Sequence, residues 1–188
     1  LKRFCSSQEK KILDKREAEE ACCLSEICQR YPCVVLLGEA GSGKTTELQW
    51  VAACYSENKE LPRPVLLTLK TYVDETMEGL AQKQGFAVEE EKELLFIIDG
   101  FDEISGACSF LKRLTDYHEQ RPKARFLISA RNHFYREGML GDFFTAVWLE
   151  PLTPGDAAEF AEGYGLDVEA FLAEVQRRRL EELLLIPF

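Results

Sequence analysis

The sequence is short of positive charge and lacks apolar runs of membrane length. Among its 188 residues, 23 are Lys or Arg and 33 are Asp or Glu, which gives a net charge of −10. Proteins whose main task is to hold nucleic acid usually carry a basic face, so this balance argues against nucleic acid as the primary ligand. No apolar run reaches the roughly 18 residues that a membrane span needs, and no signal peptide is evident. We therefore expect no membrane segment.

Paired cysteine motifs are also missing. The seven cysteines are an odd number and include no CxxC pair, so the sequence indicates neither a disulfide framework nor a zinc site. We expect reduced thiols that behave as small apolar residues in a cytoplasmic protein. The chain starts at Leu1 rather than Met and stops at Phe188, directly after an apolar stretch. We expect it to be a fragment of a longer polypeptide.

What the sequence does contain is an alternation of strand-like and helix-like segments. Short apolar runs that favour buried strands cover 33–37, 64–69, 94–98, 125–129 and 146–149. Helical patterns separate them, near 44–57, 75–85, 104–119 and 133–140. Because strands that alternate with helices form parallel sheets with right-handed crossovers, the sequence predicts an α/β fold with a central parallel five-stranded sheet.

The two ends of the chain follow a different pattern. The first residues are polar and helix-prone, with a capping box at Ser6-Ser7-Gln8-Glu9, so a linker helix in one or two pieces is expected there. After Pro151 no further strand is evident, and helices are predicted from Thr153 and from about Val168 to Leu184. The predicted domains are an N-terminal linker helix (1–31), a nucleotide-binding domain (32–151) and the beginning of a helical subdomain (152–188).

The segment between the first strand and the next helix has a pattern that cradles phosphate. Residues 38–45 read GEAGSGKT and match the P-loop pattern G-x-x-x-x-G-K-[ST]. Glycines let backbone N–H groups turn toward phosphate oxygens, and the helix N-terminus adds partial positive charge. Lys44 is expected to reach the β- and γ-phosphates of ATP, and the Thr45 hydroxyl is expected to bind Mg²⁺. The predicted nucleotide-binding residues here are Gly38, Glu39, Ala40, Gly41, Ser42, Gly43, Lys44, Thr45 and Thr46.

Acidic residues follow the third predicted strand. The apolar run ends in Asp99, at the position where P-loop proteins hold the Mg²⁺ shell. Because ligands of open α/β sheets bind at the carboxyl ends of strands, Asp99 and Gly38 are expected to face the same crevice. Asp102 or Glu103 is expected to polarise the water that attacks the γ-phosphate, with Asp102 slightly favoured and both left open.

The fourth predicted strand ends in Ser129-Ala130-Arg131. An arginine at a strand tip suits phosphate, because its planar guanidinium gives two parallel charge-assisted hydrogen bonds. Arg131 is therefore a candidate sensor of the γ-phosphate. His118 and His133 lack partners at ligand spacing, and we expect structural or surface roles for them.

Taken in order, these segments resemble the motifs of NACHT NTPases, members of the STAND class of signal-transduction ATPases. Residues 38–46 resemble their first motif, and 96–104 resemble their second, in which a small residue follows the metal-shell Asp and an acidic pair comes two residues on. Residues 127–131 resemble their sensor strand, 147–153 the segment leading into their helical subdomain, and 184–188 the apolar stretch whose proline packs near the nucleotide. Ala40 and Asn132 stand where many members have proline.

The resemblance implies a three-layer P-loop NTPase of the ASCE type that works as a switch. In that class, ADP holds a closed form, and ligand sensing by a separate flanking domain permits exchange for ATP. ATP-bound protomers then self-associate through the NTPase domain and bring effector domains together, and hydrolysis is slow. The implied cofactors are ATP, ADP and Mg²⁺, with Pro187 near the nucleotide. Residues 143–188 look most like bacterial STAND proteins, including antiphage defence ATPases.

Three interpretations stay open at this point: the STAND switch, a turnover enzyme, and a nucleotide-binding scaffold without hydrolysis. A turnover enzyme would be an AAA+-type motor or a P-loop kinase. A motor would often place Glu directly after the strand-end Asp, where this sequence has Gly100, and no acceptor pocket or lid of a kinase is identifiable. The presence of Lys44, Thr45, Asp99 and Asp102 argues against the scaffold.

Overall fold

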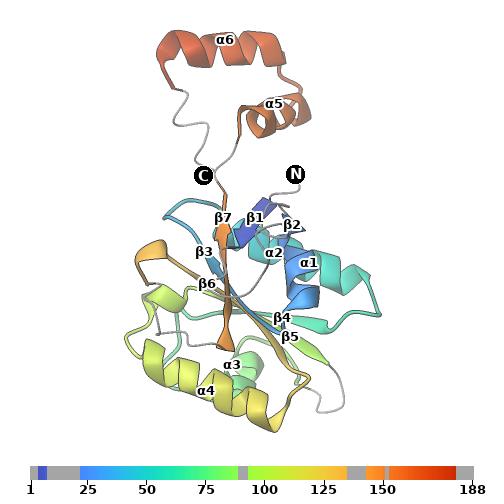
Figure 1. The fold of residues 1–188 in the computed structure, drawn as a ribbon, viewed down its shortest axis with the longest axis vertical. Helices are drawn as coiled ribbons and strands as arrows, with labels where there is room; N and C mark the ends of the chain where they lie inside the picture. Colours follow the sequence, from blue (N-terminus) through green and yellow to red (C-terminus); the bar gives the residue numbers. More distant parts are fainter. Residues whose placement is uncertain (1–3, 8–21, 89–92, 135–142, 151–152, 181–188) are drawn as a thin grey trace.

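The computed structural model describes residues 4–7, 22–88, 93–134, 143–150 and 153–180 (Figure 1). At its centre lie five parallel strands in the spatial order β7-β3-β6-β5-β4. Their bounds are β3 Cys33–Leu37, β4 Arg63–Thr68, β5 Leu94–Asp99, β6 Arg125–Ala130 and β7 Thr145–Leu149. The predicted five-stranded parallel sheet is therefore confirmed, and each strand lies where the sequence places it.

The strand order determines which side chains can meet. Strand β6 lies between β3 and β5, which is the added-strand arrangement of ASCE proteins. Because the three strands are parallel, the loop after β3, the end of β5 and the end of β6 all open at one edge of the sheet. The residues predicted to bind phosphate, metal and γ-phosphate are thereby brought to neighbouring positions.

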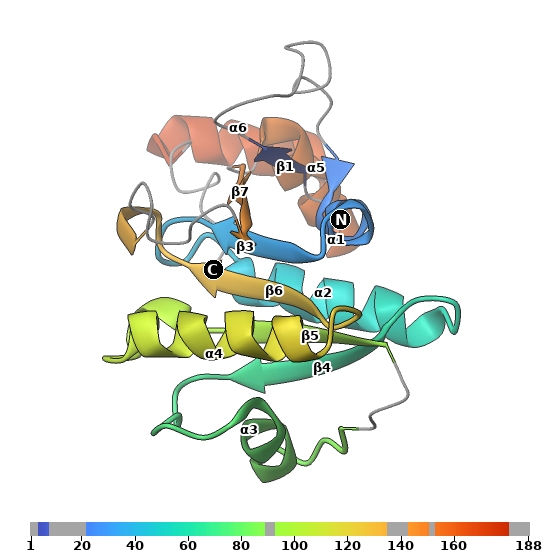
Figure 2. The ribbon, with the colours of Figure 1, turned by 60° about the horizontal axis from the view of Figure 1, so that its bottom comes forward.

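Helices cover both faces of this sheet and make a three-layer structure. Helices α1 (Leu24–Arg30) and α2 (Lys44–Glu57) pack on one face, and α3 (Met77–Lys83) and α4 (Ala107–Gln120) pack on the other (Figure 2). All five residues of β3 are buried, because alternate side chains point to opposite faces and both faces are covered. This double burial is why the strand reads as a continuous apolar run.

The start of the chain is a strand where the sequence favoured a helix. Strand β1 (Phe4–Ser7) pairs antiparallel with β7, with Ser6 opposite Trp148, and β2 (Cys22–Cys23) pairs with β1. The predicted helix start at Ser6 is therefore wrong, and Glu9 of the capping box lies outside the described residues. The physical reason is that the outer edge of β7 offers unpaired backbone groups, which β1 satisfies. The helical prediction is correct for α1, whose Leu24, Ile27 and Cys28 are buried.

Two helices follow the sheet, as predicted. They are α5 (Pro154–Gly163) and α6 (Val168–Arg178), which pack against each other and lie at one end of the molecule in Figure 1. Helix α6 ends at Arg178, and residues 181–184 of its predicted range lie outside the described part. The helix expected near 133–140 is represented by the 3-10 turn η2 (Asn132–Phe134), and 135–140 are not described. No helix in the described ranges is long and apolar enough to cross a membrane.

Candidate functional site

The loop after β3 has the backbone shape that a phosphate cradle requires. Gly43 has φ 84°, in the left-handed region that favours glycine, and α2 begins directly after it. A Cβ on Gly38 would lie 2.6 Å from Ser42 Oγ, so a larger residue there would force the Ser42 side chain to move. The N-cap residue of α2, Gly43, has no side chain that could cap the helix. Its first-turn N–H groups, together with the helix dipole, are therefore oriented for an anion.

Lys44 is held above this loop. Its Nζ donates hydrogen bonds of 2.8 Å to the carbonyl oxygens of Gly38 and Glu39. Burial lowers the pKa of Lys44 from its ordinary value, and the Asp102 carboxylate is the strongest of the nearby charges that oppose this shift. The loop carbonyl oxygens thus hold the ammonium group in place, and the carboxylates of Asp102 and Asp99 lie near it.

Thr45 and Asp99 meet as the sequence predicted for a metal pair. The Thr45 hydroxyl donates to Asp99 Oδ2 over 2.7 Å. The other carboxylate oxygen, Oδ1, accepts a hydrogen bond of 2.5 Å from Ser129 Oγ, and the Ser129 hydroxyl in turn accepts the N–H of Gly100 at 3.2 Å. Ser129 is 1% exposed. The first turn of α2 and the ends of β5 and β6 are thereby linked by one chain of hydrogen bonds that fixes the orientation of the Asp99 carboxylate.

The acidic pair and the arginine also come together. After β5, Gly100 turns the backbone with φ 86°, and the 3-10 turn η1 (Phe101–Glu103) carries both acids. Arg131 Nε lies 2.9 Å from Asp102 Oδ2, an ion pair in which the Asp102 side chain is 8% exposed and the Arg131 side chain 47%. Glu103 has no ion-pair partner in the described part of the chain. Two residues predicted to act on the γ-phosphate are therefore bound to each other.

These groups line one cleft of about 300 Å³ at the carboxyl edge of the sheet. Three of its residues are not among the site residues assigned from the sequence: Gly100, Ser129, whose strand end was noted only as part of the Arg131 sensor, and Lys70, which lies two residues after β4. Their position at or near a strand end was the available signal. The lining residues are Ala40, Gly41, Ser42, Gly43, Lys44, Thr45, Thr46, Lys70, Asp99, Gly100, Asp102, Glu103, Ser129 and Arg131.

The remaining predicted residues are placed differently. Gly38 and Glu39 contribute to the cradle through their carbonyl oxygens, which hold Lys44. The Glu39 carboxylate points to the turn η2 after β6, where its Oε1 accepts a 2.7 Å hydrogen bond from Asn132 Nδ2. Asn132, the departure from proline, thus ties the loop to the strand that carries Arg131. Pro187 lies outside the described residues, and its predicted role is untested.

The donor set fits a magnesium ion that is shared with phosphate. Within the described ranges, no three His, Cys, Asp or Glu side chains gather closely enough to hold a metal by themselves. Mg²⁺ is usually held by one or two protein oxygens together with water and substrate phosphates. The Thr45 hydroxyl and the Asp99 carboxylate, 2.7 Å apart and beside the phosphate cradle, supply that kind of partial shell.

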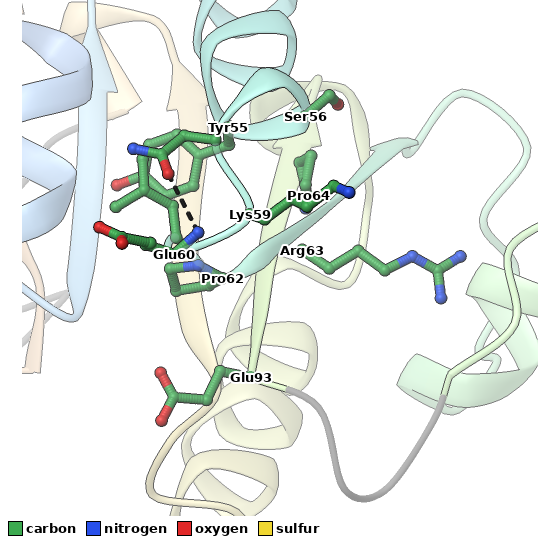
Figure 3. Close-up of a pocket in the computed structure, with 10 residues that line it drawn as sticks. Tyr55, Ser56, Lys59, Glu60, Pro62, Arg63, Pro64 and Glu93 are labelled. Carbon is green, nitrogen blue, oxygen red and sulfur yellow. Dashed lines mark hydrogen bonds between the residues drawn. The ribbon is translucent and has the colours of Figure 1, made fainter.

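A larger hollow lies at the opposite edge of the sheet. It measures about 680 Å³ and is lined by the end of α2, the loop that follows it and the start of β4 (Figure 3). Its charged side chains include Lys59, Arg63 and Glu93, which Figure 3 shows well separated around the rim. None of the motif residues lines this hollow. The cleft at the carboxyl edge is therefore the better candidate for the functional site, although it is smaller.

Comparison with known proteins gives relatives by structure only. No protein-family model matches the chain, and no curated protein matches it by sequence. The Orc1 protein of Aeropyrum pernix in complex with DNA matches with a TM-score of 0.50 at 13% identity, over 82% of this chain and 50% of that one. AMPPCP-bound DnaA from Aquifex aeolicus matches with a TM-score of 0.50 at 15% identity, over 84% and 55% of the two chains.

A third solved structure, described as a DNA replication initiation factor, gives a TM-score of 0.50 at 14% identity, over 78% of this chain and 55% of that one. The chain therefore spans about half the length of the structures it matches. At these identities the likeness shows the fold. The chain shares the three-layer α/β fold of these solved structures, with its central parallel five-stranded sheet.

Proposed function

We propose that this chain is the ATP-binding switch module of a larger signalling or defence protein of the STAND class, with a NACHT-like site. The observation that carries the proposal is the convergence of the cradle lysine, the Thr45–Asp99 pair and the Arg131–Asp102 pair on one cleft. Each of these groups suits a different part of a nucleoside triphosphate with its magnesium ion. A glycine-rich turn without a ligand would not require all of them.

Different residues of the cleft would bind different parts of the nucleotide. The backbone of residues 38–46 and the Lys44 ammonium would hold the phosphates, and Thr45 with Asp99 would hold Mg²⁺. When bound, the metal ion would neutralise charge on the phosphate oxygens. Ser129 keeps the Asp99 carboxylate oriented through its 2.5 Å hydrogen bond, as residues behind a metal ligand commonly do.

Of the two acids after Gly100, Glu103 is the better candidate for polarising water. Asp102 is engaged by Arg131 at 2.9 Å, whereas Glu103 lines the same cleft without an ion-pair partner among the described residues. A general base has to be free to accept a proton within hydrogen-bond reach of the water. This reverses the slight preference for Asp102 that the sequence pattern suggested.

The proposed switch depends on the γ-phosphate, which is present in ATP and absent from ADP. Arg131 at the tip of β6 is the group that a third phosphate would engage, and a strand tip can pass that difference to the segments that follow it. In the NACHT-like scheme, ADP maintains the resting form, ATP permits self-association, and effector and sensor domains outside this chain supply output and input. The net charge of −10 supports a nucleotide rather than DNA as the ligand of this domain.

A second candidate function is a turnover ATPase of the AAA+ type. The structural likeness to Orc1 and DnaA favours it, since those structures match this chain over 82% and 84% of its length. Gly100 argues against it, because the position after Asp99 offers no side chain to activate water. The two candidates differ in rate and in the nucleotide that is retained.

The test is the nucleotide content and turnover of the purified chain. The switch predicts that heat denaturation of the purified protein releases bound ADP, which chromatography identifies. It also predicts that steady-state hydrolysis is slow compared with the median of about 10 per second for enzymes. The Lys44→Ala variant, purified in the same way, should carry no nucleotide. Fast multiple-turnover hydrolysis by the wild-type chain would contradict the switch and favour the turnover ATPase.

A further inference from the structure

The ion pair between Arg131 and Asp102 joins two strand ends across the candidate nucleotide cleft. Arg131 follows β6, Asp102 belongs to the turn after β5, and both side chains line the cleft that contains Lys44. The carboxylate is nearly buried and the guanidinium is half exposed. A nearly buried carboxylate needs its counter-ion, whereas a half-exposed guanidinium is free to exchange one anionic partner for another.

We propose that Asp102 is a positioning residue that holds Arg131 away from the phosphates and thereby sets the preference of the site between nucleoside diphosphates and triphosphates. The inference rests on the proposed function, because it assumes that this cleft binds a nucleotide. It assigns to Asp102 a role other than water activation, and it makes the ion pair the element on which the third phosphate acts.

The energetic consequence differs for the two ligands. A diphosphate has no group that competes for Arg131, so the ion pair remains intact when it binds. A triphosphate engages Arg131 only by separating it from Asp102, and the cost of that separation lowers the affinity for the triphosphate alone. The ion pair therefore biases the site toward the diphosphate.

Lys44 is placed to limit that cost. Among the charges around the Lys44 ammonium, Asp102 has the largest favourable effect and Arg131 has an unfavourable one, so both act on the same group. When Arg131 leaves, the Asp102 carboxylate still has a cation nearby. When Arg131 exchanges Asp102 for a phosphate, the nearly buried Asp102 carboxylate therefore keeps Lys44 as a nearby cation.

The experiment compares Asp102→Asn with the wild-type chain by calorimetric titration of Mg·ADP and of the non-hydrolysable Mg·AMPPCP. Asn keeps the shape of Asp and removes the charge that holds Arg131. The expected result is an increase of about fivefold in the affinity for AMPPCP relative to ADP, the size of a partly exposed ion pair. Glu93→Gln is the control, since it removes one carboxylate from the hollow at the opposite edge of the sheet, away from Arg131 and the cleft.

The decisive comparison is the double variant with Arg131→Gln. If Asp102 acts through Arg131, the change in the AMPPCP-to-ADP ratio disappears in that background. An unchanged ratio in Asp102→Asn, or an equal shift in the Arg131→Gln background or in Glu93→Gln, overturns the inference while the nucleotide site stands. A wild-type chain that binds neither ligand overturns the proposed function and this inference together. If Asp102→Asn does not fold, Asp102→Ser with and without Arg131→Gln provides the same cycle.

Discussion

At the scale of single residues, Ser129 connects the stability of the fold to the chemistry of the site. Its hydroxyl donates to Asp99 Oδ1 and accepts from the Gly100 N–H, so it satisfies the Asp99 carboxylate and the backbone of the next turn together. Because the side chain is buried, no water can take over both bonds. Its loss would leave a donor and an acceptor without their partner.

We therefore predict that Ser129→Ala lowers the free energy of unfolding by about 1–3 kcal/mol. The same variant should weaken the dependence of nucleotide affinity on Mg²⁺, because Asp99 is no longer held in one orientation. Urea denaturation and titrations with and without Mg²⁺ measure the two effects. Ser56→Ala, which removes an exposed hydroxyl bonded only to Ala52 O, is the control and should be nearly neutral. Equal stabilities for the two variants would contradict the role of Ser129.

The acidic pair illustrates what adjacent positions in a sequence do not reveal. Asp102 and Glu103 are neighbours with the same charge, and the pattern offered no firm basis for choosing between their roles. The structure separates them by partner, since Asp102 contacts Arg131 from another strand and Glu103 does not. Contacts between residues far apart in the chain decide which of two similar groups is available for chemistry.

At the scale of elements, the connection between β4 and α3 is held rigid beside the cleft. Glu75 Oε2 accepts the N–H groups of Val73 and Asp74, and its Oε1 contacts Lys83 Nζ at 2.6 Å. From α4, Arg113 donates to the carbonyl oxygens of Asp74 and Glu75. The connection begins at Lys70, which lines the cleft. This network fixes the path of the chain at that rim of the site.

The network has a measurable pH signature. The hydrogen bond from Lys83, assisted by the backbone N–H groups, lowers the pKa of the Glu75 carboxyl from 4.5 to about 2. Because the pKa in the folded state is depressed, the contribution of Glu75 to stability is complete above about pH 4.5 and is lost as the pH falls toward 2. An NMR titration of the Glu75 carboxyl should show a midpoint near 2, and Lys83→Ala should raise it. A wild-type midpoint near 4.5 would show that the network does not form in solution.

The elements also show how far sequence patterns extend. The three central strands β3, β5 and β6 were predictable because they are buried on both faces along almost their whole length and must be largely apolar. The phosphate loop was predictable because its chemistry is local: a strand, a glycine turn and a helix start occur within one short segment. Strand β1 was not predictable, because it forms only by pairing with the edge of β7, which is distant in sequence. The roles of Ser129 and Lys70 depend on the same kind of distant contact.

At the scale of the whole molecule, the sheet is the element that makes one site from dispersed segments. Strands β3, β5 and β6 lie side by side, and each delivers one functional group to the same edge: the phosphate loop, Asp99 and Arg131. Helices α5 and α6 continue the chain from the carboxyl end of β7, at the edge toward which the site opens. A change in the charges of the cleft therefore occurs next to the segments that lead out of the domain, as a nucleotide-dependent switch requires.

The central claim is that Lys44 and the loop around it bind nucleotide phosphates, and calorimetric titration of Mg·ADP into the wild-type chain and Lys44→Ala tests it most directly. Lys44→Ala should weaken binding by about 10- to 100-fold, the loss expected when charge-assisted hydrogen bonds to phosphate are removed. Lys59→Ala, which removes a lysine from the hollow at the opposite edge of the sheet, should bind like the wild type. Undiminished affinity in Lys44→Ala, or an equal loss in Lys59→Ala, would contradict the assignment of the site.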